Sequence, residues 1–188
     1  MRSDEQLMIA YRDGDAGAFR ELFERYAPML RRWVRRWVFA EDAVGDVVQQ
    51  TFLQIHRARN DYREGAALRP WVLTIARNLA YERGRKKLRA REVPLDESRG
   101  GDVPVAPNGH RRVELNRDLA RALDELPEQQ REVILMHWVE GLSYAEIGRV
   151  VGASEGSVRL RAHRGYVTLR QALGGSNAEP GSSIKNEE

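Results

Sequence analysis

The sequence contains no cysteine, which excludes a disulfide framework and any metal site built on thiolates. No apolar run approaches the roughly 20 residues that a membrane-spanning helix requires. The first residues, MRSDEQLMIAYRDGD, lack the apolar stretch of a secretory signal peptide. Together these absences predict a soluble, cytoplasmic protein.

Signals for catalysis and metal binding are also scarce. The four histidines, His56, His110, His137 and His163, fall on different predicted elements, without the spacing of metal ligands. No pair of carboxylates has the arrangement expected of a general acid and base. We therefore expect no metal ion, no cofactor and no enzymatic activity.

Strand-like alternation is missing, and nearly all of the hydrophobic periodicity is helical. Ser3 and Gln6 predict a capping box, and Pro28 predicts a kink or a restart of the helix that contains it. In residues 29–38, MLRRWVRRWV, the apolar side chains form one stripe and the arginines lie opposite. We expect the tryptophans to lie in the core rather than to bind a ligand. The arginines could equally well face solvent or contact phosphate.

Composition along the chain predicts an all-α fold of two small helical domains, each with its own modest core. A helix over about 41–59 has the predicted buried set Val44, Val47, Val48, Phe52 and Ile55. Gly65 and Pro70 interrupt it, and the next helix ends in a basic segment. Residues 92–111 carry prolines, glycines and no helical stripe, which indicates a flexible linker between domains over 1–91 and 112–173. Residues 174–188 are too polar to fold alone.

The segment LSYAEIGRVVGASEGSVRLRAHR predicts a helix-turn-helix in the C-terminal domain. Ser143 and Glu146 form a capping box in sequence, and Ser154 supplies a second N-cap. Gly152 provides the turn between the helices, and Gly148 falls where they cross. Caps and glycines at this spacing are more specific to a helix-turn-helix than a run of charged residues would be.

The second helix of this pair has the pattern of a helix that reads the major groove of DNA. Val158, Ala162, Gly165, Tyr166 and Leu169 share the predicted buried side. Gly156, Ser157, Leu160, His163 and Arg164 face away from it, with Arg159 and Arg161 at the margins. A helix N-terminus and arginines can bind phosphates while exposed side chains meet base edges. The alternative is a helical hairpin with a solvated basic face. The net charge of +3 and the pI of about 9.4 are only weak evidence for a polyanionic partner.

Three segments resemble the bacterial sigma-70 family of RNA polymerase sigma factors. AEDAVGDVVQQTFLQIHRA resembles the acidic, glutamine-bearing helix of these proteins, and YREGAALRPWVLTIARNLAYERGRKK resembles their promoter-melting region. LDELPEQQREVILMHWVEGLSYAEIGRVVGASEGSVRLRAHRGYVTLR resembles their C-terminal promoter-reading domain. The order of the segments, over about residues 12–173, is similar to that of the extracytoplasmic-function (ECF) class.

The resemblance implies a sigma factor that binds core RNA polymerase and directs promoter-specific initiation of transcription. It implies contacts with duplex −35 DNA, with melted −10 DNA and with an anti-sigma factor. The helix matching residues 42–52 would dock on the polymerase clamp through an exposed face, with Phe52 buried behind it. The polymerase-binding residues carried over are Asp42, Asp46, Gln49 and Gln50. Gln50 departs from the family pattern, which usually has an acid there.

The resemblance also implies two sets of DNA-binding residues. The loop over 60–69 matches the element that captures an unpaired −10 base, and Pro70 departs from its usual pattern. The −10 set is Asn60, Asp61, Tyr62, Arg63, Arg77 and Asn78. The −35 set is Ser154, Glu155, Ser157, Arg159, Leu160, Arg161, His163 and Arg164. Leu160 stands where a small polar residue is common and could meet a thymine methyl group.

Two alternatives remain at this level. The loop over 60–69 could simply join two helices. The whole chain could instead be a two-domain helix-turn-helix regulator that acts without replacing the housekeeping sigma factor.

Overall fold

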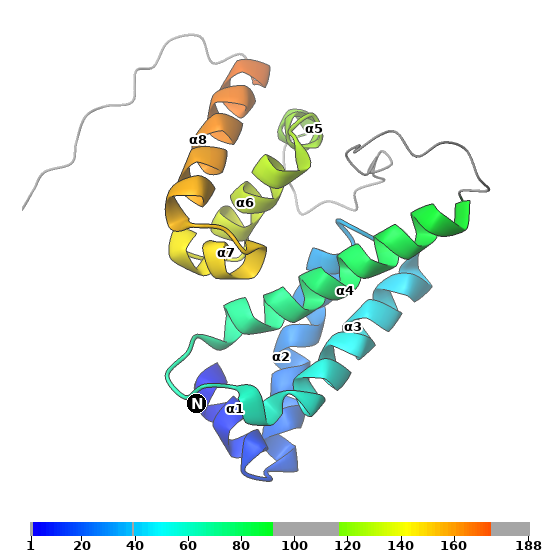
Figure 1. Cartoon of the computed structure of the whole chain (residues 1–188), viewed down its shortest axis with the longest axis vertical. Helices are drawn as coiled ribbons and strands as arrows, with labels where there is room; N and C mark the ends of the chain where they lie inside the picture. Colours follow the sequence, from blue (N-terminus) through cyan, green and yellow to red (C-terminus); the bar gives the residue numbers. More distant parts are fainter. Residues whose placement is uncertain (1, 39, 92–116, 174–188) are drawn as a thin grey trace, which may run out of the picture.

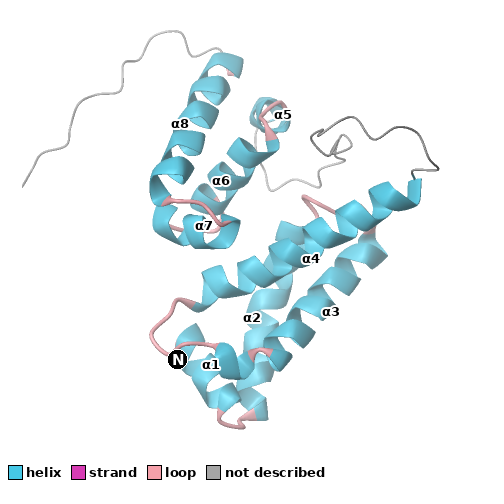
Figure 2. Cartoon of the chain, viewed as in Figure 1, coloured by secondary structure: helices cyan, strands magenta, loops and turns pink. Residues whose placement is uncertain are grey.

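The computed structural model describes residues 2–38, 40–91 and 117–173, with the side chains of its longest helix described as far as Arg83. These residues form eight α-helices and one short 3-10 turn, and no strand occurs among them (Figure 2). The prediction of an all-α fold is confirmed. The predicted linker over 92–111 and the tail over 174–188 lie outside the described residues.

The N-terminal half is a bundle whose helices begin at recognisable caps. The Ser3 hydroxyl accepts a hydrogen bond from the backbone N–H of Gln6, so the predicted capping box is confirmed. The Asp15 carboxylate caps the second helix by accepting from the N–H of Ala18. The elements of this half are α1 (Asp4–Arg12), α2 (Ala16–Val34), α3 (Glu41–Arg57), η1 (Arg59–Asp61) and α4 (Leu68–Arg91).

A kink or a restart of the helix was predicted at Pro28; the restart is wrong, because α2 runs through this residue without interruption. Proline removes one backbone hydrogen bond and leaves the carbonyl four residues earlier without its usual partner. Both Pro28 and Glu24 are exposed, so water can reach that carbonyl. The position on the outer face of the bundle therefore makes the proline tolerable.

The predicted apolar stripes form the core of this half. Met29, Leu30, Trp33 and Val34 are buried on α2, and the whole predicted set on α3 is buried against them. With 1% of its surface exposed, Trp33 is a core residue rather than a ligand platform. The arginine face is divided: Arg31, Arg32 and Arg35 are exposed, whereas Arg36 lies under the other half of the molecule.

The C-terminal half contains α5 (Arg117–Asp124), α6 (Glu128–Trp138), α7 (Tyr144–Val151) and α8 (Glu155–Ala172). The Ser143–Glu146 capping box and the Ser154 N-cap are both present as predicted. Gly152 ends α7 in the left-handed conformation, with a φ of 69°, which glycine adopts without strain. A Cβ atom on Gly148 would lie 2.6 Å from the backbone oxygen of Ala153, so the two helices cross closely at this glycine.

The two halves pack against each other, with α7 lying across α4 (Figure 1). One cluster of buried side chains runs without a break from Leu7 in α1 to Ala162 in α8. A smaller cluster joins α5, α6 and α8. The prediction of two separate cores is therefore only partly correct, because the face of α4 that meets α6 and α7 belongs to the shared core.

Within the described ranges, no helix is both long and apolar enough to cross a membrane.

Candidate nucleic-acid interface

The helix α8 has one buried side and one side exposed to solvent. Val158, Ala162, Gly165 and Leu169 are buried against the rest of the C-terminal half. On the opposite side Leu160 is 50% exposed, and His163 and Arg164 are also exposed. Leu160, His163 and Arg164 therefore lie on the outer face of α8, where the helical pattern of the sequence placed them.

The arginines of α8 differ in how freely they reach solvent. The Arg159 side chain is 66% exposed; it pairs with Glu155 one turn earlier and lies over the Tyr144 ring, 5.5 Å from its centroid. Arg161 is half-buried, and its charge acts on the buried carboxyl of Glu132. Arg159 and Arg164 are thus the arginines best placed for phosphate contacts, and Ser157 is half-buried beside the helix N-terminus.

An aromatic cluster beside α8 was missed by sequence reasoning. The His137 ring stacks on Tyr144 with centroids 4.6 Å apart, and its Nδ1 lies 2.7 Å from the carbonyl oxygen of Leu142. Trp138 is 72% exposed and donates its indole N–H to the hydroxyl of Tyr166. Burial raises the pKa of Tyr166 to about 12. The signal was three aromatic rings within eight residues, His137, Trp138 and Tyr144, where the helix-turn-helix begins.

The predicted −10 loop combines exposed polar groups with a buried anchor. Asn60, Asp61 and Arg63 are exposed. Tyr62 differs from the prediction, because only 3% of it is exposed and its ring lies 5.5 Å from that of Trp71. Its hydroxyl donates to the carbonyl of Ala66, closing the loop on itself. Tyr62 therefore supports the loop from inside and does not line its outer surface.

On α4, the two predicted DNA contacts point to different surroundings. Asn78 is exposed, whereas Arg77 faces the C-terminal half. Arg77 Nε and Nη2 lie 2.6 Å and 3.2 Å from the two carboxylate oxygens of Glu132. Burial raises the pKa of Glu132, whereas the nearby guanidinium opposes that rise. In this arrangement of the two halves, the Arg77 guanidinium is hydrogen-bonded to the Glu132 carboxylate.

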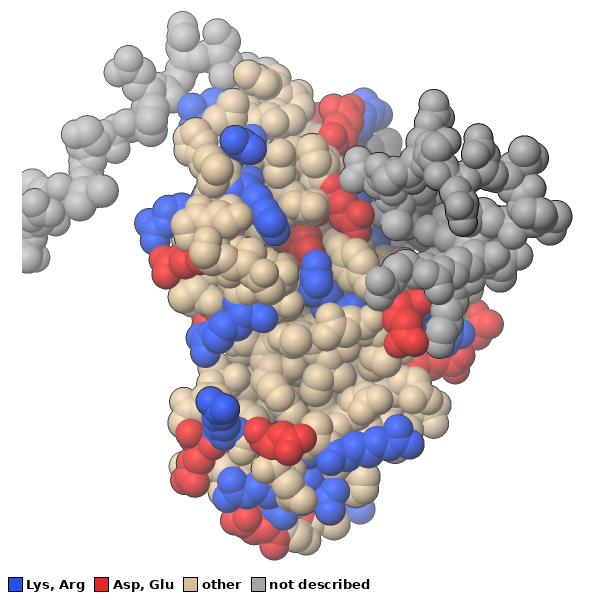
Figure 3. Space-filling model, viewed as in Figure 1, with Lys and Arg blue, Asp and Glu red and all other residues tan. Residues whose placement is uncertain are grey.

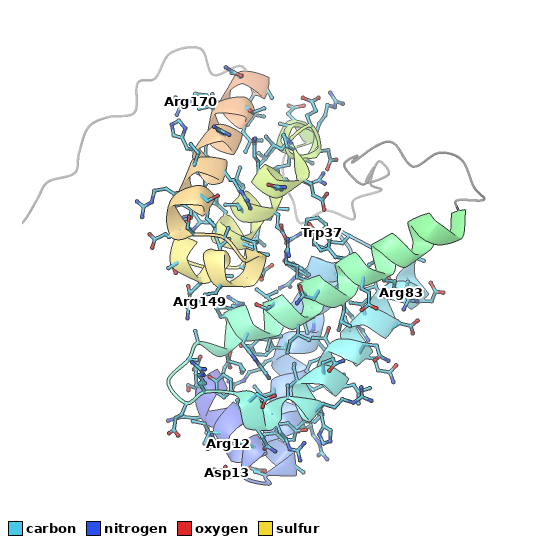
Figure 4. All side chains as sticks on the ribbon, viewed as in Figure 1. Arg12, Asp13, Trp37, Arg83, Arg149 and Arg170 are labelled. Carbon is cyan, nitrogen blue, oxygen red and sulfur yellow. The ribbon has the colours of Figure 1, made fainter. Side chains whose placement is uncertain are left out.

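The predicted polymerase-binding residues share the outer face of α3. Asp42, Asp46, Gln49 and Gln50 are all exposed, because the buried set of this helix occupies its other side. Asp46 Oδ2 lies 2.8 Å from Arg83 Nη2 on α4, and Figure 4 shows Arg83 on the side of α4 next to α3. Leu53, 37% exposed, extends this face by one turn and was missed by sequence reasoning.

The charges on the visible face of the molecule are interspersed. Figure 3 shows Lys and Arg beside Asp and Glu at both ends of the molecule, with an uncharged band across its middle. This face has no large patch made of Lys and Arg alone.

Comparisons with known proteins agree with the sequence patterns. Residues 22–90 match the family Sigma-70 region 2, and residues 116–169 match Sigma-70 region 4. The chain is 38% identical over 167 residues to the RNA polymerase sigma factor CarQ of Myxococcus xanthus, covering 89% of this chain and 95% of CarQ. It is 31% identical over 173 residues to the ECF RNA polymerase sigma factor SigM of Mycobacterium tuberculosis, covering 92% and 86%.

Solved structures give the same picture of the fold. The structure of CnrH in complex with the cytosolic domain of CnrY matches with a TM-score of 0.65 and 25% identity, over 93% of this chain and 99% of that one. The sigma factor RpoE of Bartonella quintana, in complex with the anti-sigma factor NepR, matches with a TM-score of 0.62 and 24% identity. That match covers 85% of this chain and 98% of the other.

Proposed function

The chain belongs to the ECF class of RNA polymerase sigma factors, and from that premise we propose how its two halves divide promoter recognition. Proteins of this family are transcription initiation factors rather than enzymes. The chain binds core RNA polymerase and directs initiation at particular promoters. The observation that carries this function is that both sigma regions occur in order on one chain that matches its relatives over most of their length.

We propose that α8 reads the −35 element in the major groove. Leu160, His163 and Arg164 form its exposed face, and Ser154, Glu155 and Ser157 lie at its N-terminal end. The backbone N–H groups there favour a phosphate, and Arg159 lies beside them. Arg161, half-buried near Glu132, has a mainly internal role in this proposal.

Replacing Arg159 with alanine should weaken −35 binding through the loss of a phosphate contact. We expect the slope of log K against log salt to fall by about one unit, with little change in preferred sequence. Replacing Leu160 with serine is the matched variant: it should leave the salt slope unchanged and shift preference in a randomised upstream library. Binding titrations at several salt concentrations measure both effects. An Arg159→Ala protein with the wild-type salt slope would remove this residue from the phosphate contacts.

We propose that the loop over 60–69 captures an unpaired base of the melted −10 element. Asn60, Asp61 and Arg63 are exposed on its surface, and Tyr62 supports them from within. Flipping a base into a loop requires a pocket that keeps its shape when the duplex opens. The internal hydrogen bond from Tyr62 to Ala66 supplies that rigidity.

Exchanging the exposed residues of this loop for those of another ECF loop of equal length, with Tyr62 kept, should change −10 preference. Binding to the −35 element should stay the same, because α8 lies in the other half of the chain. Transcription from a library randomised at −10 measures the first effect, and binding to upstream duplex measures the second. Unchanged −10 preference would leave the loop only the role of joining two helices.

We propose that the outer face of α3 docks on core RNA polymerase. The face combines the carboxylates of Asp42 and Asp46 with the amides of Gln49 and Gln50, and Leu53 adds an apolar group at one end. Carboxylates surrounded by amides complement a basic partner surface. The chain would meet its polymerase in the cytoplasm.

We further propose that an anti-sigma factor binds this chain. The support is the match to RpoE of Bartonella quintana, whose solved structure contains the anti-sigma factor NepR. Such a partner would have to cover surfaces used for polymerase or DNA.

The proposed function is tested by reconstituted transcription with core polymerase and a library of candidate promoters. We expect transcripts only when the chain and core polymerase are both present, from templates that share −35 and −10 elements. A two-domain regulator would instead bind duplex specifically without polymerase and give no transcript with core polymerase alone. That outcome would overturn the division of labour proposed here.

A further inference from the structure

The first residue of α4 is capped by a side chain that lies 63 positions earlier in the chain. The backbone N–H of Leu68 donates to Oε1 of Glu5, on α1, at 3.2 Å. The first N–H groups of an α-helix have no partner within the helix, and Leu68 is buried, with only 1% of its surface exposed. Glu5 therefore supplies the acceptor that a local N-cap side chain supplies at α1, α2, α7 and α8.

The sequence at the start of α4 explains why its cap comes from another helix. Ala67, directly before the helix, has no acceptor in its side chain. An N-cap side chain usually binds the N–H of the second or third helical residue, and the third residue here, Pro70, has no N–H. The helix start thus lacks its usual acceptor and one of its two usual donors, and a carboxylate from α1 binds the first N–H instead.

The neighbouring carboxylate fixes α1 in the position from which Glu5 reaches α4. Asp4 accepts a hydrogen bond from the Tyr26 hydroxyl at 2.7 Å and pairs with Arg25 at 2.7 Å, both on α2. Burial and the hydrogen bond to Asp4 raise the pKa of Tyr26, so its hydroxyl stays protonated and remains a donor. Because Asp4 attaches the first turn of α1 to α2, Glu5 in the same turn is held close to Leu68.

Glu5 acts on the loop over 60–69 at two points. Leu68 lies near the C-terminal end of the loop, where α4 begins. Within the loop, burial raises the pKa of Tyr62, and the negative charge of Glu5 adds to this effect, so the hydroxyl stays protonated and donates to Ala66. The helix α1 contacts both η1 and α4, the elements at the two ends of the loop (Figure 1). The shape of the loop therefore depends on a residue outside it.

We propose that Glu5 is a positioning residue for the base-capturing loop. Its carboxylate holds the N–H at which α4 begins and so fixes the end of the loop against α1. This inference rests on the proposed function, which assigns the −10 base to the loop. A binding site discriminates between ligands only when its polar groups are held in place by the residues around them. Loss of the Glu5 contact should therefore reduce the discrimination between −10 bases.

The test is a discrimination ratio, measured by transcription with the full chain and core polymerase. Transcription from the preferred −10 sequence is divided by transcription from a template in which one −10 base is changed. A smaller amount of folded protein lowers both values and leaves the ratio unchanged. We expect Glu5→Ala to lower the ratio about tenfold, the factor that corresponds to one hydrogen bond to a charged acceptor. The matched control, Glu24→Ala, removes the same charge at an exposed position of α2 and should stay within about twofold of wild type.

Two conservative variants separate the hydrogen bond from the charge. Glu5→Gln keeps an acceptor oxygen at the same distance from the backbone and should stay within about threefold of wild type. Glu5→Asp keeps the charge but is one methylene group shorter, so it should behave like Glu5→Ala. Hydrogen exchange adds a readout without DNA: the amides of residues 60–68 should exchange faster in Glu5→Ala than in wild type, whereas those of α2 should not change.

A wild-type ratio in Glu5→Ala or Glu5→Asp would overturn the proposal, and so would a Glu5→Gln protein as impaired as Glu5→Ala. The loop exchange described above distinguishes this failure from a failure of the proposed function. If the loop exchange changes −10 preference and Glu5→Ala does not, the role of Glu5 alone is refuted. If neither changes it, base capture by the loop is refuted as well.

Discussion

Replacing Asp46 with arginine is expected to abolish capture of core RNA polymerase by a chain that still folds. Asp46 lies on the exposed face of α3 with Asp42, Gln49 and Gln50. In the proposed docking, the reversal would place a positive charge against a basic partner surface. Like charges brought together in an interface cost several kcal/mol. At about 1.4 kcal/mol per factor of ten, the loss of affinity is at least about 100-fold.

The fold should survive this substitution. The Asp46 side chain is 56% exposed, and its ion pair with Arg83 is a surface pair of the kind that contributes at most about 1 kcal/mol. Asp13→Arg is the matched control, since Asp13 is 62% exposed at the C-cap of α1 and is not among the residues of the proposed docking face. Titration of labelled polymerase measures affinity, and circular dichroism checks folding. Wild-type affinity in a folded Asp46→Arg protein would refute the docking face, and lost affinity in Asp13→Arg would show that the effect is not specific to it.

The second large effect is expected from replacing Gly148 with valine. A Cβ atom at this position meets the backbone oxygen of Ala153 at 2.6 Å, and backbone cannot move aside as the end of a flexible side chain can. Overpacking of this kind costs about 1–3 kcal/mol, and a branched side chain belongs at the upper end. Because α7 and α8 would be pushed apart, we expect −35 binding to be lost along with stability.

The control for Gly148→Val is Gly156→Val in the first turn of α8. An added Cβ at Gly156 meets no atom within 4 Å, so this variant carries the backbone cost of valine without the clash. Urea denaturation of both proteins isolates the effect of the crossing. Equal stability of the two variants would contradict the close approach of α7 and α8 at Gly148.

Most of the local structure could be predicted from the sequence, because its causes are local. Ser3, Ser143 and Ser154 cap helices with groups only three residues away, and the buried sets of α2, α3 and α8 follow from a period of 3.6 residues. The family resemblance, carried by three ordered segments, supplied the function. The candidate site residues were placed by that resemblance and by exposure on a helical wheel.

The contacts between the halves could not be predicted in the same way. Arg77 and Glu132 are 55 residues apart, and Tyr81 and Glu128 are 47 residues apart. No local pattern sets the register of α6 on α4, so Arg77 was assigned to the −10 set without any sign of its carboxylate partner. Tyr62 shows the same limit on a smaller scale, since its burial depends on Trp71, across the turn of the loop. Pro28 was misjudged because its tolerance depends on exposure rather than on local propensity.

The central claim, that this chain gives core RNA polymerase the ability to recognise and open a promoter, is tested most directly by mapping unpaired bases. Promoter DNA chosen from the transcription library is treated with a reagent that modifies unpaired thymines, in the presence of the chain, of core polymerase, or of both. We predict modification at the −10 element only when both are present. Protection of duplex DNA by the chain alone, with no modified thymines after polymerase is added, would contradict the claim.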